Sequence, residues 1–287
     1  MALHVPSPIA SRHYPFPSIM SEPKLEFVNC PDAQGGHRMA YWRWGRPGAP
    51  HVVLCVHGLT RQGRDFDTLA QAVCDRGGDA VSVICPDVAG RGRSDWLKDP
   101  QCYQIPYYAG DMLALLSQLQ PDTLDWVGTS MGGLIGMAVA GQPELPVYAR
   151  IRRLVLNDVG PTIEPSALVR IGQYLGNTGA FNSEQQAADA TWAVSSTFGP
   201  HSPAQWLALT RPMLKPMDDG TGRLTLHYDP ALAVPFAAVT PESAAQGEAM
   251  LWQAYDRITA TTLLVRGADS DLLSPETAQA MTQRGPK

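Results

Sequence analysis

Ser130 stands in the pattern Gly128-x-Ser130-x-Gly132, which can present a serine hydroxyl as a nucleophile. The apolar run Leu124–Val127 precedes the pattern, and apolar residues at helical spacing follow it as far as Val139. A strand, a sharp turn and a helix in this order would place Ser130 at the apex of the turn with a positive φ, which is uncommon outside glycine. The two glycines lack a Cβ, so strand and helix can approach closely. We therefore predict that Ser130 is a catalytic nucleophile.

Attack on a carbonyl carbon would leave a negatively charged oxygen that needs fixed N–H donors. Each such donor lowers the barrier by about 3 kcal/mol. The backbone N–H of Met131, one residue after the nucleophile, is the natural first donor. We expect the second from the backbone N–H of Leu59, which follows His57-Gly58 in the turn after the apolar run Val52–Val56. The His57 ring itself is expected to bond to the backbone and to take no part in the reaction.

Alternating strand and helix patterns must position these residues. Short apolar runs separated by helical segments predict an α/β fold with a mostly parallel, doubly wound sheet covered by helices on both faces. The predicted strands are Lys24–Asn29, His37–Trp44, Val52–Val56, Val81–Cys85, the run before Gly128, Arg153–Asn157 and Thr261–Arg266. The predicted helices of this part are Asp65–Arg76, Pro106–Leu119, the one after Ser130, and a last one that Ser274 caps and Pro275 begins.

The strand rhythm is interrupted between Thr162 and about Tyr255, where helical segments occur without a strong strand. We interpret this part as a helical cap inserted over the carboxyl ends of the strands. The predicted organisation is a loose leader at residues 1–23, a core at 24–160 and 257–287, and a cap at 161–256. The expected cap helices are Pro165–Leu175, Ser183–Thr197, Pro203–Leu214 and Pro241–Asp256.

Composition excludes several classes of partner. The net charge is −5, and the Lys and Arg residues are scattered, which argues against nucleic acid. With 44% hydrophobic and 17% charged residues the chain is typical of a well-packed globular protein. No apolar run approaches the roughly 18 residues that span a bilayer, so no membrane partner is expected. The first 20 residues lack the continuous apolar segment of a secretory signal.

The cysteines and histidines indicate neither disulfides nor a metal. There are five cysteines, an odd number, and Cys55 and Cys85 fall within strand-like runs. This pattern is typical of reduced thiols in a cytoplasmic protein. No His-x-x-x-His pair, metal-ligand spacing or dinucleotide glycine signature occurs. We therefore expect no cofactor and no metal.

Four motifs occur in order along the chain: His57-Gly58, Asp87-x-x-Gly90-x-Gly92-x-Ser94, Gly128-Thr129-Ser130-Met131-Gly132-Gly133 and Gly267-Ala268-Asp269-Ser270-Asp271. Together they resemble the α/β-hydrolase fold family, in the branch of capped esterases, lactonases and C–C bond hydrolases. The resemblance spans about Lys24 to Lys287 and implies a serine, an acid and a histidine in that chain order.

The resemblance places the acid after the seventh strand, where two carboxylates compete. Asp271 lies four residues before Pro275, which matches the family's Asp-x-x-x-Pro placement, and it is the favoured candidate. Asp269 comes two residues earlier. Asp158, after the sixth strand, matches an acid position that some relatives use and is the third choice. A carboxylate that is not the catalytic acid would cap a turn.

The family pattern also implies a histidine base after an eighth strand, but no histidine occurs after His227. We therefore expect that the sequence is truncated before the last strand, the histidine loop and the closing helix. Without the base, Ser130 would be a weak nucleophile. An uncovered seventh strand would expose a sheet edge and favour association, for example as a homodimer.

The leading hypothesis is a carboxylesterase-like serine hydrolase (EC 3.1 class) that cleaves an ester or related acyl bond of a small substrate through an acyl-enzyme. The aromatic and Met content of the cap suggests an apolar substrate, although the same residues could simply form the cap core. Alternatives on the same scaffold are a C–C bond hydrolase and a cofactor-free perhydrolase. An inactive small-ligand binder is the remaining alternative, and only the absent histidine supports it.

Overall fold

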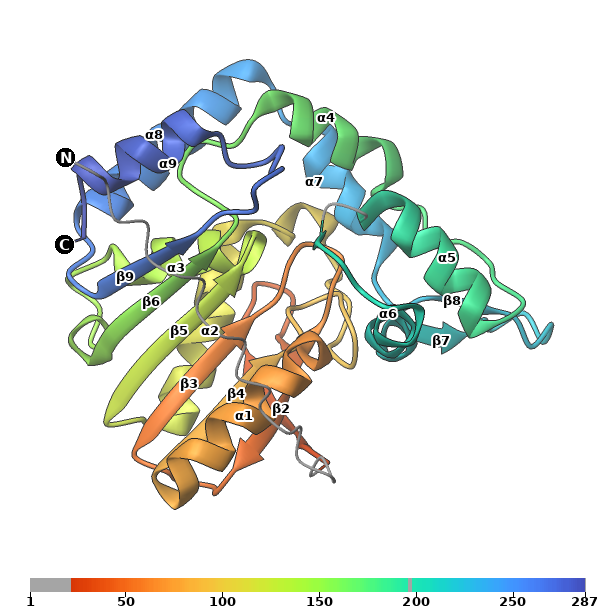
Figure 1. Cartoon of the computed structure of the whole chain (residues 1–287), viewed down its shortest axis with the longest axis horizontal. Coiled ribbons are helices and arrows are strands. Elements are labelled where there is room, and N and C mark those ends of the chain that lie inside the picture. The colour runs from red at the N-terminus through yellow and green to blue at the C-terminus, as the bar shows by residue number, and fades with distance from the viewer. Residues whose placement is uncertain (1–21, 196–197, 287) are drawn as a thin grey trace, which may run out of the picture.

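The computed structural model of the chain describes residues 22–195 and 198–286. A seven-stranded sheet forms its centre (Figure 1), in the order β1-β2-β4-β3-β5-β6-β9. The first two pairings of this order are antiparallel and the other four are parallel, which confirms the predicted mostly parallel sheet. The strands are β1 (Lys24–Cys30), β2 (His37–Gly45), β3 (His51–Val56), β4 (Val81–Pro86), β5 (Thr123–Thr129), β6 (Ile151–Asn157) and β9 (Thr261–Val265). The predicted leader lies almost wholly outside the described residues.

After its first residue, His51, the central strand β3 is apolar because both of its faces are covered. Val52, Leu54 and Val56 pack into one core cluster together with residues of α2 (Ile105–Leu119) and α3 (Met131–Ala140). Val53 and Cys55 pack on the opposite face with residues of α1 (Asp67–Gly77) and of its preceding turn. Alternate side chains of a strand point to opposite faces, so a doubly covered strand has no polar face.

A further helix, α8 (Pro241–Asp256), packs against α3 on the core. A Cβ atom added to Gly141 would overlap the backbone of Ala254, so the two helices meet with almost no gap there. Tyr255 of α8 is buried and donates a hydrogen bond to the carbonyl oxygen of Met281 at 3.0 Å. The helix therefore belongs to the core packing, although its residues fall in the range predicted for the cap.

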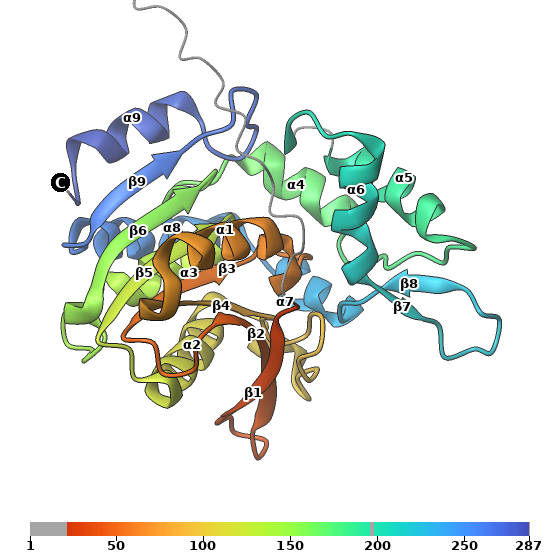
Figure 2. The ribbon, with the colours of Figure 1, turned by 60° about the horizontal axis from the view of Figure 1, so that its bottom comes forward.

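The inserted region lies beyond the carboxyl ends of the parallel strands, as Figures 1 and 2 show. Its helices are α4 (Pro165–Tyr174), α5 (Glu184–Ser195), α6 (Pro203–Thr210) and α7 (Ala233–Ala237). The sequence predicts no strong strand in this region, and the structure has one short antiparallel pair there, β7 (Leu214–Pro216) with β8 (Leu224–Leu226). Strands of three residues are too short to show a period of two in the sequence.

The last helix, α9 (Pro275–Gln283), begins where the sequence predicts. The Ser274 hydroxyl accepts the backbone N–H of Thr277 at 3.2 Å, and Pro275 occupies the first helical position. Within residues 22–195 and 198–286, no helix combines the length and apolar character that crossing a bilayer requires.

Candidate active site

Ser130 occupies the turn between β5 and α3 with φ 50° and ψ −118°. This is the positive φ that the elbow hypothesis requires, at a cost of about 1–3 kcal/mol for a residue other than glycine. Two close approaches hold the turn in this geometry. A Cβ atom on Gly128 would overlap the backbone of Gly132, and one on Gly132 would overlap the carbonyl group of Val56. The backbone N–H of Ser130 is bonded to the carbonyl oxygen of Asn157 at 3.0 Å, which ties the turn to β6.

The hydroxyl of Ser130 and the backbone N–H of Met131 are both left available by this turn. Ser130 is the N-cap residue of α3, but its side chain makes no capping hydrogen bond. Met131 is the first residue of the helix, where backbone N–H groups have no partner within the helix. The helix dipole adds partial positive charge at this end. A developing negative charge beside Ser130 would therefore be stabilised.

The turn after β3 lies directly against Ser130. A Cβ atom built on Gly58 would be 3.8 Å from the Cβ of Ser130. The carbonyl oxygen of Gly58 accepts the backbone N–H of Arg61 at 3.1 Å and lies 2.7 Å from His57 Nδ1. The carbonyl of Gly58 and the N–H of Leu59 belong to one trans peptide and point in opposite directions. The N–H of Leu59 therefore points away from the backbone N–H of Arg61 and from His57 Nδ1.

His57 holds this turn as a neutral imidazole, in agreement with the backbone-bonding role expected for it. The ring is fully buried; Nδ1 donates to Gly58 and Nε2 accepts the backbone N–H of Val88 at 2.9 Å. Burial lowers the pKa of His57 to about 3. Since both ring nitrogens are bonded to the backbone, His57 cannot also receive the proton of Ser130.

Asp87 organises the loop after β4. Its buried carboxylate accepts the backbone N–H of Gly63 at 2.7 Å and of Arg93 at 2.8 Å. The close approach requires glycine at position 92, where φ is 52° and a Cβ atom would overlap the carboxylate. Burial raises the pKa of Asp87 to about 6. The Asp87-to-Ser94 motif therefore fixes the conformation of the loop after β4.

Arg91 is a buried residue of this loop that sequence reasoning did not select. Its side chain has no exposed surface and reaches both Leu59 and Met131, the two predicted oxyanion donors. The signal available in the sequence was its place between Gly90 and Gly92, since a charged residue between two motif glycines sits in a tightly fixed turn. Its charge alone predicts an exposed side chain, because most arginines are exposed.

The three candidate acids lie near the carboxyl ends of β6 and β9 in different surroundings. Asp271 forms an ion pair with Arg170 of α4 at 2.6 Å, and its side chain is 44% exposed. Asp158 accepts the backbone N–H of Gly267 at 2.9 Å and the hydroxyl of Ser270 at 3.0 Å. Asp269 is exposed. The choice of Asp271 stays a prediction.

No hydrogen bond in the described part of the chain joins a histidine ring to the Ser130 hydroxyl. His201 packs edge-on to the ring of Trp206 in the inserted region, with the ring centroids 5.6 Å apart. Burial lowers the pKa of His227, in the same region, to about 4. His4 and His13 lie outside the described residues. The general base therefore stays an expectation from the resemblance.

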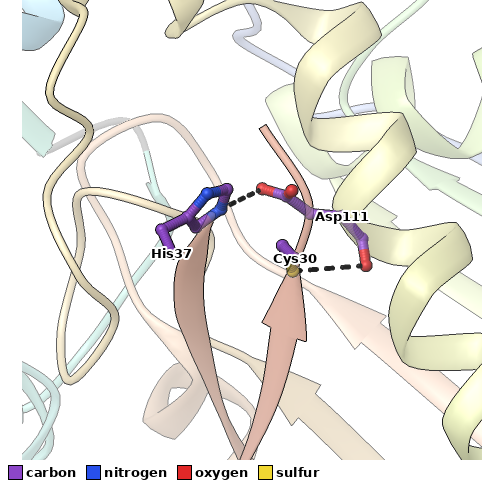
Figure 3. Close-up of side chains that lie close together, drawn as sticks. All are labelled: Cys30, His37 and Asp111. Carbon is purple, nitrogen blue, oxygen red and sulfur yellow. Dashed lines mark hydrogen bonds and ion pairs between the residues drawn. The ribbon is translucent and has the colours of Figure 1, made fainter. Parts of the chain in front are cut away.

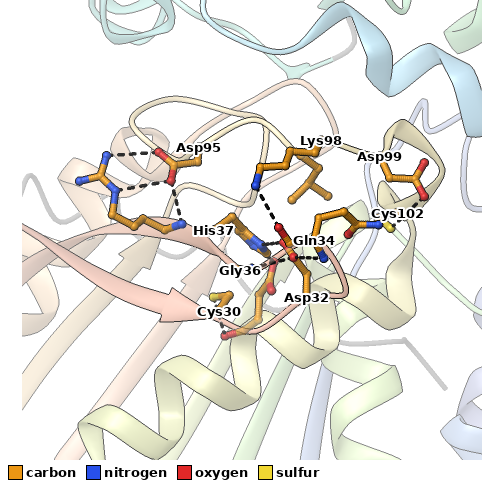
Figure 4. A network of polar contacts seen from close by, with 12 residues as sticks. Cys30, Asp32, Gln34, Gly36, His37, Asp95, Lys98, Asp99 and Cys102 are labelled. Atoms are coloured by element: carbon orange, nitrogen blue, oxygen red, sulfur yellow. Dashed lines mark hydrogen bonds and ion pairs between the residues drawn. The ribbon is translucent and has the colours of Figure 1, made fainter.

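A second polar cluster lies away from Ser130, where the β1–β2 hairpin meets α2 (Figures 3 and 4). His37 Nδ1 is 3.0 Å from the carboxylate of Asp32, and Nε2 is 3.1 Å from that of Asp111. We call these three residues the hairpin anchor. They line part of a cavity of about 170 Å³.

Cys30, His37 and Asp111 form the group in residues 22–195 and 198–286 whose ligand atoms could meet at a metal ion, all within 4.8 Å of one another. Burial raises the pKa of the Cys30 thiol, which opposes the thiolate that a metal would bind. Hydrogen bonds to two carboxylates already satisfy both nitrogens of His37. The arrangement is thus accounted for as a structural anchor.

The sheet, the serine elbow and the adjoining His-Gly turn are those of an α/β hydrolase. Residues 53–287 match the alpha/beta hydrolase family. The chain is 51% identical over 267 residues to a 3-hydroxybutyrate-oligomer hydrolase of Cupriavidus necator, covering 92% of this chain and 88% of the relative. This chain belongs to the α/β-hydrolase family, and it is a hydrolase.

Solved structures agree with this assignment. An alpha/beta hydrolase from Novosphingobium aromaticivorans is 33% identical, with a TM-score of 0.76 over 93% of this chain and 90% of that one. A putative hydrolase from Rickettsia typhi is 25% identical, with a TM-score of 0.77 over 92% and 88% of the two chains. A thioesterase domain from the curacin biosynthetic pathway, at 23% identity and a TM-score of 0.69, shares the fold.

Proposed function

We propose that this protein hydrolyses ester bonds, and that its substrates are short linear oligoesters of 3-hydroxybutyrate. The single observation that carries the proposal is the similarity to the 3-hydroxybutyrate-oligomer hydrolase at 51% identity over nearly the whole chain. The geometry around Ser130 supports it. A strained serine with an unused hydroxyl lies at a helix N-terminus and against a second backbone turn, which suits attack on an ester carbonyl.

In the proposed reaction the Ser130 Oγ attacks the ester carbonyl carbon and the carbonyl oxygen becomes negatively charged. The N–H groups of Leu59 and Met131 bind that oxygen. Collapse of this intermediate breaks the bond to the leaving hydroxyl of the next unit and leaves an acyl-serine, which water then hydrolyses. In the family that the chain resembles, a histidine oriented by the acid takes the serine proton and passes it to the leaving oxygen; Asp271 is the acid proposed here, and the sequence has no histidine after His227.

The aromatic residues of the inserted region contribute less to the substrate proposal than their number suggests. Trp192 and Trp206 pack edge-on against each other at 5.0 Å between ring centroids, and Trp206 is buried. Its ring N–H donates to the carbonyl oxygen of Ala188 at 2.8 Å. These contacts describe a small core within the insert. We therefore base the substrate class on the relative and not on the composition of the cap.

The test is hydrolysis of 3-hydroxybutyrate dimer and trimer, in both enantiomeric forms, by the purified protein. We expect release of monomer by the wild type and a loss of at least about 1,000-fold in S130A. A fluorophosphonate probe should label the wild type stoichiometrically and leave S130A unlabelled. Labelling without cleavage of either oligomer would overturn the substrate class but keep the serine hydrolase. A folded protein that is neither labelled nor active would favour the small-ligand binder.

A further inference from the structure

The guanidinium group of Arg91 lies beneath the two predicted oxyanion donors and contacts both residues. Its Nε donates to the carbonyl oxygen of Leu59 at 2.8 Å, and its Nη2 donates to Met131 Sδ at 3.4 Å. These two atoms form one edge of the planar guanidinium. A single rigid group therefore spans the turn after β3 and the first residue of α3.

The opposite end of the guanidinium is equally fixed. Nη1 donates to the carbonyl oxygen of Ala89 at 2.7 Å and to the hydroxyl of Tyr108 at 2.9 Å. The ring of Tyr108 faces the charge at 4.9 Å from Cζ, and the ring of Tyr103 does so at 5.9 Å. Four of the five N–H donors of Arg91 are thus used, and its orientation is set by three separate segments of the core.

The charge of Arg91 has no acidic partner in direct contact. Among residues 22–195 and 198–286, no carboxylate oxygen lies within 4.0 Å of its guanidinium nitrogens. Asp229 is separated from it by Tyr103, whose hydroxyl donates to the Asp229 carboxylate at 2.6 Å. A fully buried cation without a paired anion is costly and is rarely retained without a use.

In the proposed reaction a negative charge develops on the substrate oxygen that the N–H groups of Leu59 and Met131 bind, and Arg91 contacts both of these residues. We propose, on the basis of the proposed function, that Arg91 is a positioning residue of the oxyanion hole. It holds Leu59 and Met131 at the spacing that the oxyanion requires, and its positive charge stabilises the oxyanion more than the uncharged ester. Fixed charges and dipoles that face a developing charge in a site of low dielectric account for large parts of many enzymatic rates.

Two variants separate this role from simple packing. R91M keeps most of the side-chain volume and removes both the charge and the hydrogen bonds. R91K keeps a charge but cannot span Leu59 and Met131 with one planar edge. R64M is the control, because the Arg64 guanidinium also lies over an aromatic ring, that of Trp42 at 4.9 Å, but Arg64 is only partly buried and lies outside the site.

The measurement combines kcat and KM for the oligoester with the inhibition constant of a trifluoromethyl ketone analogue, which forms a tetrahedral oxyanion on the serine. Fluorophosphonate titration counts the folded, competent sites. We expect kcat to fall about 100-fold in R91M and about 10-fold in R91K, with KM changed less than threefold. The inhibition constant should rise by the same factors, and R64M should stay within twofold of the wild type.

A merely structural role would lower the number of titratable sites and leave kcat per site and the inhibition constant unchanged, and that result would overturn the proposal. If R91M does not fold, R91K alone decides, because wild-type kcat and inhibition constant in R91K would exclude positioning by the guanidinium. A wild type that cleaves no ester at all would overturn the proposed function instead.

Discussion

His57 Nδ1 lies 2.7 Å from the carbonyl oxygen of Gly58, and this contact fixes the direction of the peptide that carries the Leu59 N–H. The same ring accepts the N–H of Val88 at 2.9 Å and thereby joins the loops that follow β3 and β4. A histidine next to the active site is thus used to shape a backbone turn. Its neighbour Arg91 fixes the following peptide through the Leu59 carbonyl, so both sides of Leu59 are held.

Replacing His57 by alanine should loosen this turn. The backbone groups of Gly58 and Val88 would lose a buried partner, which costs about 1–3 kcal/mol each, so we expect H57A to be destabilised by about 3 kcal/mol. Displacement of the Leu59 N–H should lower kcat by about 10- to 100-fold. Urea unfolding and ester hydrolysis check the two effects. Wild-type kcat in a folded H57A would show that the turn does not depend on the ring.

The H57A variant should also change the response to acid. The folded-state pKa of His57, about 3, lies below its ordinary value of 6.5, so the unfolded chain takes up the proton first. The wild type therefore loses stability as the pH falls from about 6.5 toward 3. H57A should lack the part of this loss that His57 causes. Asp87 titrates in an overlapping range with the opposite sign, because its pKa is raised to about 6. The difference between wild type and H57A removes the Asp87 contribution.

Two glycine substitutions should have opposite effects on stability. A Cβ atom on Gly132 would overlap the carbonyl group of Val56, so G132A must push the elbow helix off the sheet. Gly110 lies in α2 with no atom within 4 Å of an added Cβ, and alanine is the better helix former. We expect G132A to lose at least about 2 kcal/mol and G110A to gain about 0.5–1 kcal/mol. Thermal unfolding measures both, and equal effects would contradict the predicted crowding.

The hairpin anchor should give a second pH dependence. Burial alone would lower the pKa of His37, but hydrogen bonds to Asp111 and Asp32 more than reverse this, so its pKa is raised. The stability that the anchor contributes is therefore fully present below about pH 6.5 and is lost as the pH rises through the folded-state pKa. We expect the difference in unfolding free energy between wild type and H37Q to shrink from pH 6 to pH 9. A difference that stays constant or grows over this range would contradict the predicted contribution of His37.

The sheet could be predicted from the sequence because its buried strands consist of runs of apolar residues. Strand β3 is covered on both faces and is apolar without interruption from Val52 to Val56, whereas β2 begins with His37 and Arg38 at an edge of the core. The elbow could be predicted for a related reason. Gly128 and Gly132 are required by close contacts that no residue with a Cβ permits.

What the sequence could not show depends on contacts between distant segments. Arg91 is a charged residue by composition, and its burial follows only when Leu59, Tyr108 and Met131 surround it. The helix α8 has an amphipathic pattern that suits either a cap or a core, and its packing against α3 decides between them. The β7–β8 pair is too short to have a pattern of its own.

The last prediction concerns the acid of the proposed triad. Asp271 is the favoured candidate, but the structure pairs its carboxylate with Arg170, while Asp158 is bonded to Gly267 and Ser270. If Asp271 orients the base, D271N should lower kcat by about 10,000-fold with little loss of stability, because its ion pair with Arg170 is open to solvent, with side chains 42% and 44% exposed, and contributes at most about 1 kcal/mol. D158N should instead lower stability, because the amide cannot accept both bonds, and should leave kcat within about tenfold.

The R170M variant separates these effects. It removes the partner of Asp271 without touching the carboxylate, so we expect wild-type kcat or a small increase as the carboxylate becomes free to orient the base. Single-turnover assays of D271N, D269N, D158N and R170M, with sites counted by the fluorophosphonate probe, decide among the three acids. A large fall of kcat in D158N together with an active D271N would move the catalytic acid to the end of β6. The triad would then use the carboxylate that already ties β6 to the loop after β9.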